Sequence, residues 1–303
     1  MSRDGDRFDA EGDLTVPFRA PGWDLGRVRL QPAGRPLVMG IINLTPDSFW
    51  AGSRSTVPDA ALDLAQRLAD EGADLLDLGA ESSRPGAAPV GVDEELARLL
   101  PVLRRLRTLT DLPLTVDTVR ADTAIAALAE GADAINDISA GTHDPGLLPC
   151  VARAGAGLVL MHMRGTPATM QDAPSYGDVV GEVAAWLAER AAAAEAAGVA
   201  PGRIAVDPGL GFGKTPAHNL ALLRGAAATA GGRPLLVGAS RKSFIAAVAG
   251  SGGAGTMIDP GDRLPGSLAA LAAAWRAGAT VVRVHDVAAS RQFLDVLAAI
   301  ADV

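Results

Sequence analysis

The chain has 303 residues, a formal net charge of −8 and a pI near 5.0, and 49% of its residues are hydrophobic although only 4% are aromatic. An acidic chain without a basic footprint is not expected to bind nucleic acid or a membrane surface. One cysteine, Cys150, excludes an internal disulfide framework; together with a polar N-terminus and no apolar run of membrane-spanning length, it predicts a cytoplasmic protein.

Residues 1–36 contain several prolines and show no sustained periodicity. We expect them to form an irregular N-terminal extension that packs on the outside of the fold. From residue 37 to 303, one unit repeats: a short apolar run, a polar turn and an amphipathic helix. The expected strands are Leu37–Ile42, Asp74–Leu78, Leu114–Val116, Ala134–Ile138, Gly157–Met161, Arg203–Val206, Pro234–Val237 and Thr280–Val284. Helices between them include Pro58–Glu71, Asp93–Thr108, Arg120–Glu130, Asp178–Ala197 and Leu264–Ala277.

This alternation predicts an α/β chain that folds as one (β/α)₈ TIM barrel, because the number of units and their total length fit that fold. A doubly wound sheet has the same alternation, but it usually opens with a glycine-rich dinucleotide fingerprint after its first strand. Here the first expected strand is followed by the segment Asn43–Phe49, which contains no such fingerprint. We therefore favour the barrel.

Catalytic groups of such barrels gather at the C-terminal ends of the strands. Polar residues stand at these ends throughout the chain, and they include both of its lysines, Lys214 and Lys242. In chain order they are Asn43 and Asp47; Glu81, Ser83 and Arg84; Asp117; Asn136 and Asp137; His162; Asp207 and Lys214; Ser240, Arg241 and Lys242; and Arg283, His285 and Asp286. So many polar groups at one rim of an apolar barrel predict an active site.

Two acids, Asp117 and Asp207, each close an apolar run. A carboxylate at the edge of a barrel core needs hydrogen-bond donors, because burying it unpaired is costly. A heterocycle with an amidine-like N–H edge, such as a 2-amino-pyrimidinone, would offer each acid a planar pair of donors. Asn136 can both donate and accept. The alternative is that the acids only form structural salt bridges with arginines.

Cationic groups at separate strand ends predict a phosphate or pyrophosphate site in this acidic protein. These groups are Arg84, Lys242, Arg283 and His285. Asn43 is placed to orient a hydrated Mg²⁺ that bridges the phosphate oxygens. An alternative for Arg283 and His285 is a pair at the barrel rim that is held by Asp286.

The segment Asp207–Thr215 is rich in glycine but is not a Walker A loop, because Pro208 stands where that pattern needs glycine. We expect its glycines to adopt positive φ and to allow a close approach to a ligand. Phe212 is a candidate for stacking on that ligand or, alternatively, for anchoring the loop. The histidines lack the spacing of metal ligands, so His162 is expected to line the pocket rather than bind zinc.

The strand ends resemble, one after another, those of the dihydropteroate synthase family of pterin-binding TIM barrels. The segments that carry the resemblance are Met39–Phe49, Gly79–Ala87, Val116–Thr118, Ile135–Ser139, Leu160–Met163, Asp207–Lys214, Val237–Ser243 and Arg283–Val287. They span roughly residues 37 to 300, and so many ordered motifs are far more specific than any one of them.

The resemblance implies a transferase, usually a homodimer, that uses Mg²⁺. Such an enzyme condenses 6-hydroxymethyl-7,8-dihydropterin diphosphate with p-aminobenzoate to give 7,8-dihydropteroate and pyrophosphate in folate biosynthesis. In its mechanism, diphosphate leaves the pterin methylene carbon and the neutral aryl amine attacks, so the protein mainly positions the substrates and neutralises charge.

The resemblance also implies roles for single residues. The positions that match pterin-binding residues are Asp117, Asn136, Asp207 and Lys242. Those that match diphosphate-binding residues are Asn43, Arg84, Arg283 and His285, with Asn43 as the metal ligand. Those that match the p-aminobenzoate pocket, where sulfonamides compete, are Phe49, Ser83, Pro85, Phe212 and Ser240. The expected catalytic groups are Lys242, Arg84, Asp117, Arg283 and His285.

Three positions depart from the family pattern. Ala51 replaces an acid of the first loop, so the enzyme is slower or relies on Asp47 if that acid assists the metal or the amine. Ala80 and Ala140 replace glycines, which we expect to have a mild effect.

Two alternative functions remain. The first is a pterin-binding paralogue without synthase activity, which Ala51 and Trp50 favour. The second is a methyltransferase-type barrel that binds methyltetrahydrofolate, and Arg84 and the turn at Ser240–Lys242 count against it because that reaction has no diphosphate to bind.

Overall fold

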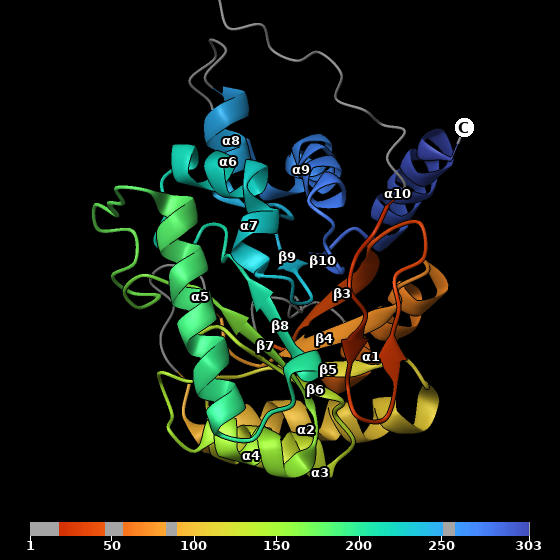
Figure 1. Cartoon of the computed structure of the whole chain (residues 1–303). Coiled ribbons are helices and arrows are strands. Elements are labelled where there is room, and N and C mark those ends of the chain that lie inside the picture. Colours follow the sequence, from red (N-terminus) through yellow and green to blue (C-terminus); the bar gives the residue numbers. More distant parts are fainter. Residues whose placement is uncertain (1–17, 46–56, 83–89, 251–257, 303) are drawn as a thin grey trace, which may run out of the picture.

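The computed structural model describes residues 18–45, 57–82, 90–250 and 258–302, and its parallel sheet confirms the predicted (β/α)₈ barrel (Figure 1). The strands are hydrogen-bonded in the order β8-β7-β6-β5-β4-β3-β10-β9. A parallel bridge between Val206 of β8 and Leu235, next to β9, joins the two ends of the sheet. The strands are β3 (Leu37–Asn43), β4 (Leu75–Gly79), β5 (Leu114–Asp117), β6 (Ala134–Asp137), β7 (Gly157–Met161), β8 (Ile204–Asp207), β9 (Leu236–Val237) and β10 (Val281–Val284).

Helices surround the strands (Figure 1). They are α1 (Val57–Asp70), α2 (Val92–Leu109), α3 (Ala121–Ala129), α4 (Leu147–Ala154), α5 (Val179–Ala196), α6 (Pro216–Arg224), α7 (Ala226–Ala230), α8 (Ser243–Ala249), α9 (Leu264–Arg276) and α10 (Val287–Ala301), with short 3₁₀ turns at Pro201–Arg203 and Pro260–Arg263. The expected strands and helices agree with these bounds to within two residues. Among the described segments, no helix is both long and apolar enough to cross a membrane.

Local sequence explains where helices begin. Asp178 precedes α5 and its carboxylate accepts a hydrogen bond from the Gly181 amide, which satisfies one of the unpaired N–H groups of the first turn. Before α6, Thr215 and His218 form a reciprocal capping box, and Pro216 occupies the first helical position, where a missing N–H has no consequence.

The described part of the N-terminal segment, residues 18–36, does not pack on the outside, and this corrects our expectation for these residues. Its described part contains a hairpin of two short antiparallel strands, β1 (Trp23–Asp24) and β2 (Arg29–Leu30). Trp23 is fully buried, and it packs in one cluster with residues from the N-terminal halves of the barrel strands. The cluster comprises Trp23, Leu25, Leu30, Met39, Leu75, Ala134, Val159, Ala205, Leu236 and Val281. The indole Nε1 also donates to the Arg203 carbonyl at 2.9 Å. The hairpin thus closes the bottom of the barrel.

The barrel interior changes from apolar to polar along the strands. Side chains two residues apart point to the same face of a strand, and the first member of each pair lies in the bottom cluster while the second is polar. The pairs are Leu75 and Asp77 on β4, Ala134 and Asn136 on β6, Ala205 and Asp207 on β8, and Val281 and Arg283 on β10. This alternation carries the polar groups to the C-terminal end of the barrel.

Ala140, which stands where the family has glycine, has a φ of +52°. That left-handed conformation costs an alanine about 1–2 kcal/mol. Its methyl group is fully buried in the core, which returns about 0.8 kcal/mol. The two effects partly offset each other, in line with a mild substitution.

Candidate active site

Five side chains from four strands form a hydrogen-bonded layer inside the barrel, which we call the polar layer. It consists of Asp77, Thr115, Asp117, Asn136 and Arg283. The Asp77 carboxylate is fully buried and accepts from Arg283 Nε at 2.6 Å and from Asn136 Nδ2 at 3.3 Å. The Thr115 hydroxyl donates to the same carboxylate. Arg283 also reaches Asp117, with 3.2 Å between Nη2 and Oδ2. One guanidinium therefore bridges two carboxylates.

Burial raises the pKa of Asp117 to about 7. The positive charge of Arg283 opposes this shift, whereas the neighbouring carboxylate of Asp77 adds to it. A carboxyl group with such a pKa changes its charge near neutral pH, which is typical of functional sites. The ion pair of the structural alternative is present, but it engages Asp117 through a single oxygen, Oδ2.

Asp207 closes β8 and lies near both lysines of the chain. Its Oδ1 accepts from the Gly209 amide at 2.7 Å. Burial raises the pKa of Asp207, while the charges of Lys242 and Lys214 lower it. The Lys242 ammonium donates to the Leu210 carbonyl and lies 4.7 Å from the centre of the Phe212 ring.

Burial also lowers the pKa of Lys242 to about 8, against the favourable charge of Asp207. Arg283 interacts electrostatically with Asp207 as well as with Asp117. The two acids therefore open onto the same end of the barrel, and the predicted convergence of anions and cations is present.

The end of β10 and the loop after β9 meet through Ser240 and His285. The Ser240 hydroxyl oxygen lies 3.2 Å from the His285 amide, which donates to it, and 3.1 Å from its ring Nδ1. The carboxylate of Asp286 pairs with Arg241, not with Arg283 or His285. The alternative in which Asp286 holds the latter two is therefore wrong.

The glycines of the loop after β8 do adopt positive φ, as expected, but their close neighbours belong to the protein. A Cβ on Gly209, which has a φ of +65°, would lie 1.9 Å from the His162 carbonyl oxygen. A Cβ on Gly213 would lie 2.5 Å from the Arg164 carbonyl oxygen. These glycines let the loop after β8 lie directly against the loop after β7.

His162 and Lys214 join the same two loops through their side chains. The Lys214 Nζ lies 3.0 Å from the His162 Nδ1, and it donates to the Phe212 carbonyl at 2.9 Å. Burial lowers the pKa of His162 to about 3, and the Lys214 charge adds to this effect. His162 is buried, as the lining role requires, and its Nδ1 contacts the Lys214 side chain.

Asn43 is the last residue of β3 and stands beside Gly79 in the strand register. Within the described ranges, no group of three His, Cys, Asp or Glu residues could hold a metal ion. A Mg²⁺ bound there would have to take most of its oxygens from substrate phosphates and water, which is the usual mode for this ion. Asn43 fits that mode, because it supplies one amide oxygen at the strand end.

Several predicted site residues lie outside the described residues. They are Asp47, Phe49, Trp50, Ala51, Ser83, Arg84 and Pro85. Two other acids at strand ends are engaged in structural contacts. Glu81 pairs with Arg120 at 2.5 Å, and Asp137 accepts from the amide and hydroxyl of Ser139.

Reading only the strand ends missed Asp77 and Arg120. Asp77 lies in an apolar strand two residues after Leu75, so both side chains point into the barrel. An acid at such a position can be recognised from the two-residue alternation of side chains along a strand. Arg120 donates to the Val90 carbonyl at 2.7 Å as well as pairing with Glu81. It thereby ties together the two sides of segment 83–89, and no local pattern indicates this.

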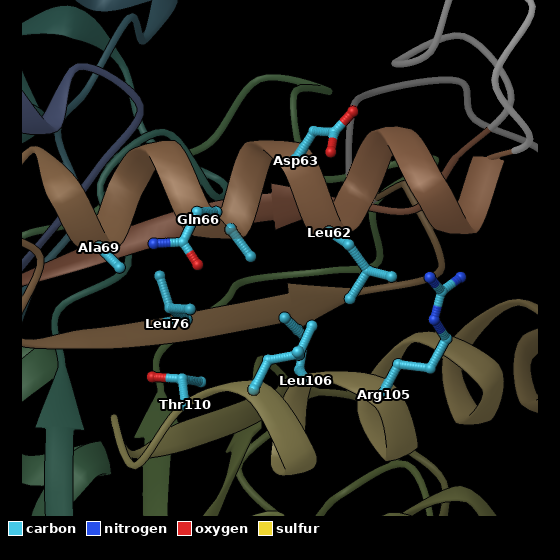
Figure 2. Close-up of a pocket in the computed structure, with 10 residues that line it drawn as sticks. Leu62, Asp63, Gln66, Ala69, Leu76, Arg105, Leu106 and Thr110 are labelled. Carbon is cyan, nitrogen blue, oxygen red and sulfur yellow. The ribbon is translucent and has the colours of Figure 1, made fainter.

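A groove of about 330 Å³ lies between α1 and α2 on the outer side of the sheet (Figure 2). Leu62, Leu76 and Leu106 line it from α1, β4 and α2. Asp63 points away from it in Figure 2. The charged lining residues of the groove are Asp63 and Arg105, and Arg105 pairs with Asp59, so the polar layer remains the candidate site.

Comparison with known proteins identifies the family. Residues 39–285 match the pterin binding enzyme family. The chain is 41% identical over 285 residues to a dihydropteroate synthase of Synechocystis sp., covering 94% of this chain and 96% of that protein. It is 46% identical over 277 residues to the dihydropteroate synthase of Neisseria meningitidis serogroup C, covering 90% and 95%.

Solved structures give the same result. The dihydropteroate synthase of Xanthomonas albilineans with 4-aminobenzoic acid is 46% identical, with a TM-score of 0.86 over 94% of this chain and 99% of that one. The same enzyme in complex with 7,8-dihydropteroate has a TM-score of 0.83 at 44% identity, over 93% of this chain and 100% of that one.

Proposed function

This chain belongs to the dihydropteroate synthases, within the family of pterin-binding enzymes, and we propose that the end of its barrel around Asp117 and Asp207 is where the reaction takes place. The enzyme condenses 6-hydroxymethyl-7,8-dihydropterin diphosphate with p-aminobenzoate to give 7,8-dihydropteroate and pyrophosphate. The observation that carries the proposal is that Asp117 and Asp207 are the last residues of the parallel strands β5 and β8, and that Arg283 of β10 pairs with Asp117.

The pterin ring lies against the polar layer. Asp117 and Asp207 accept from its N–H groups, because ionised carboxylates make short, charge-assisted bonds with such donors. Asn136, which donates to Asp77, has a carbonyl oxygen and a further N–H for the ring. Lys242 donates to a ring acceptor, and its charge lowers the pKa of Asp207, which burial raises.

The diphosphate lies toward the ends of β3 and β10, near Asn43 and His285. Arg84, outside the described residues, completes this cationic side. Arg283 contributes positive charge from its place between two carboxylates, so it supports the pterin pocket at least as much as the leaving group. A Mg²⁺ held by Asn43 and the diphosphate would neutralise charge on the leaving oxygen.

The p-aminobenzoate pocket includes Phe212 and Ser240, with Phe49, Ser83 and Pro85 from segments outside the described residues. The Phe212 ring offers an aromatic face, and the Ser240 hydroxyl is held by His285. A sulfonamide, whose aryl amine resembles the substrate, would compete here. A Yersinia pestis dihydropteroate synthase, 38% identical to this chain, has been solved in complex with a sulfonamide drug.

The chemical step breaks the bond between the methylene carbon and the diphosphate oxygen, and its electron pair stays with the diphosphate. The lone pair of the aryl amine then forms the new C–N bond, and the amine loses one proton to solvent. No strong base is needed, because the attacking amine is neutral. The residues act by positioning the two substrates and by stabilising the charge that develops on the leaving group.

We also propose a cytoplasmic homodimer. Leu220 of α6 and Val248 of α8 are each nearly half exposed, and their helices are neighbours in the fold. Such an apolar face suits a second copy of the chain. Light scattering of the purified protein and of Leu220→Glu tests this, because the variant should be monomeric.

The synthase activity is tested by mixing the purified chain with the pterin diphosphate, p-aminobenzoate and Mg²⁺ and measuring pyrophosphate release. Release that requires all three supports the function. Tight pterin binding without release at saturating substrates would support the inactive paralogue, and retention of methyltetrahydrofolate instead of the diphosphate would support the methyltransferase-type barrel. Asp207→Asn, which keeps the shape but removes the charge, should abolish release.

A further inference from the structure

Lys214 is a buried lysine for which the reaction described above has no use. It lies in the loop after β8, directly before Thr215 at the start of α6, and only 3% of it is exposed. A buried lysine is uncommon because removing an ammonium from water is costly. A position that retains one needs a compensating set of partners.

Its partners match its hydrogen-bonding capacity. A lysine ammonium has three N–H donors, and Nζ has three acceptors: His162 Nδ1 at 3.0 Å, the His162 carbonyl at 3.3 Å and the Phe212 carbonyl at 2.9 Å. With the charged ammonium as donor, Nδ1 accepts, and the imidazole is then neutral with its proton on Nε2. Burial lowers the pKa of Lys214 to about 7, so this arrangement belongs to the protonated lysine. Lys214 therefore selects one tautomer of His162.

The surroundings hold the imidazole in place. Its ring meets Trp186 edge-on, with 4.9 Å between centroids. The Tyr176 hydroxyl donates to the Gly213 carbonyl at 2.9 Å, and the Gln171 amide donates to the Gly211 carbonyl at 2.7 Å. The loop after β7 thus contacts the loop after β8 at several points. Among the contacts of Tyr176, Gln171 and Lys214, only that of Lys214 involves a charged group.

The contact between Lys214 and His162 also positions Phe212, because the Phe212 carbonyl accepts from Lys214 while the Phe212 ring faces Lys242. Fixing that carbonyl fixes the peptide plane from which the ring projects. Lys242 in turn donates to the Leu210 carbonyl in the same loop. The two lysines thereby hold the loop from opposite sides.

We propose that Lys214 is a positioning residue of the p-aminobenzoate subsite: its ammonium, anchored on His162, fixes the loop after β8 so that Phe212 presents its ring to the second substrate. This inference rests on the assignment of Phe212 to that subsite in the proposed function. Lys214 itself touches neither substrate, and its link to the pterin pocket is a charge interaction with Asp207 that is weaker than that of Lys242.

Lys214→Met tests the inference, because it keeps the length of the side chain and removes all three donors. The KM for p-aminobenzoate should rise at least about tenfold, as expected when hydrogen bonds to a charged group are lost. The Kd for the pterin diphosphate, measured by calorimetry, should change less than about twofold. An unchanged KM for p-aminobenzoate in the folded variant overturns the inference, as does an equal loss of affinity for both substrates.

Arg164→Met is the matched control. Arg164 is a cation of the adjoining loop that pairs with Glu182 on the surface and makes no bond to Phe212. Its KM values should match those of the original chain. A KM increase equal to that of Lys214→Met would mean that any loosening of the two loops suffices, and it would overturn the specific role of Lys214.

A spectroscopic readout keeps the inference testable apart from catalysis. In a ¹H–¹⁵N spectrum of histidine-labelled protein, His162 should show the Nε2-protonated tautomer and should not titrate between about pH 5 and 8. In Lys214→Met it should lose the fixed tautomer and titrate at higher pH. If the original chain releases no pyrophosphate, the proposed function is wrong. If His162 of the original chain titrates freely, the hydrogen bond between Lys214 and His162 is absent and the inference is wrong, whatever the activity.

Discussion

The guanidinium of Arg283 lies against the carboxylate of Asp77, with 2.6 Å between Nε and Oδ2, inside the polar layer. The pair joins β10 to β4 inside the barrel, and Asp77 is fully buried. Arg283 uses a second nitrogen to reach Asp117. The position of the cation at the site therefore depends on an acid that does not itself face the opening.

Asp77→Asn should destabilise the protein and weaken pterin binding together. Removing one partner of a buried ion pair leaves the other charge uncompensated, at a cost of about 3–5 kcal/mol. The remaining carboxylate of Asp117 limits this cost, so we expect about 3 kcal/mol in the free energy of unfolding from denaturant titration. The control is Glu130→Gln, which breaks the surface pair with Arg104 and should leave stability unchanged. Equal effects of the two changes would contradict a special role for Asp77.

Pterin binding should strengthen as the pH rises through neutrality. The pKa of Asp117 is raised to about 7, so below that pH its carboxyl group is largely protonated and accepts less well from the ring N–H groups. Binding must then release a proton. Calorimetry at pH 6 in buffers of different ionisation enthalpy should detect this release, and Asp117→Asn should abolish most of it. No buffer dependence in the original chain would contradict the assignment.

The same shift makes a prediction for folding. Asp117 has a folded pKa above its ordinary value of 3.8, so between about pH 4 and 7 the folded state binds more protons than the unfolded state. The contribution of Asp117 to stability should therefore fall as the pH rises through this window and stay constant above it. The difference in unfolding free energy between the original chain and Asp117→Asn, followed from pH 4 to 8, measures this contribution. A difference that increases in favour of the original chain with pH would show the opposite sign.

Lys242→Ala should lose pterin binding and turnover together while the fold persists. Lys242 neutralises Asp207, so its removal leaves that acid protonated or uncompensated next to the ring. The fold should persist because burial already disfavours the charged lysine, whose pKa is lowered to about 8. Calorimetric titration with the pterin diphosphate, pyrophosphate release and a thermal melt test the three parts. Retained turnover would show that the role is wrongly assigned.

Gly209→Ala and Gly231→Ala distinguish two requirements for glycine, a positive φ and the lack of space for a Cβ. Both residues have positive φ, but a Cβ on Gly231 meets no atom within 4 Å whereas on Gly209 it would lie 1.9 Å from the His162 carbonyl oxygen. Gly231→Ala should therefore cost only the left-handed conformation, about 1–2 kcal/mol. Gly209→Ala should cost more than about 4 kcal/mol, in the range of exceptional substitutions, and should weaken p-aminobenzoate binding. Similar unfolding free energies for the two variants would contradict the close contact of the two loops.

Local sequence was sufficient for much of the site. A polar residue that closes an apolar run indicates the C-terminal end of a strand, and all such ends meet at one rim once the strands are parallel. Asp117, Asn136, Asp207 and Arg283 were located in this way, because strand position and side-chain direction follow from a period of two. The roles of Asn43, Ser240 and His285 toward substrates remain predictions.

The ion-pair partners of these residues could not be predicted from their positions in the strands. Arg283 was assigned to the diphosphate, yet its nearest carboxylates are Asp77 and Asp117. Asp286 pairs with Arg241. Which acid meets which arginine depends on the inclination and spacing of strands that are far apart in the chain, and no local pattern contains that information.

The sequence alone determined that this chain forms a (β/α)₈ barrel, at which end its chemistry lies and which charge types meet there, since these follow from the alternation of side chains along each strand and helix. Tertiary structure alone decided that Trp23 and its hairpin enter the bottom of the barrel, that Asp77 holds Arg283, and that Lys214 joins two loops through His162. The physical reason is that burial and ion pairing are properties of the closed barrel. They arise only when residues far apart in the chain, such as Asp77 and Arg283 with a separation of 206 residues, come within hydrogen-bonding distance.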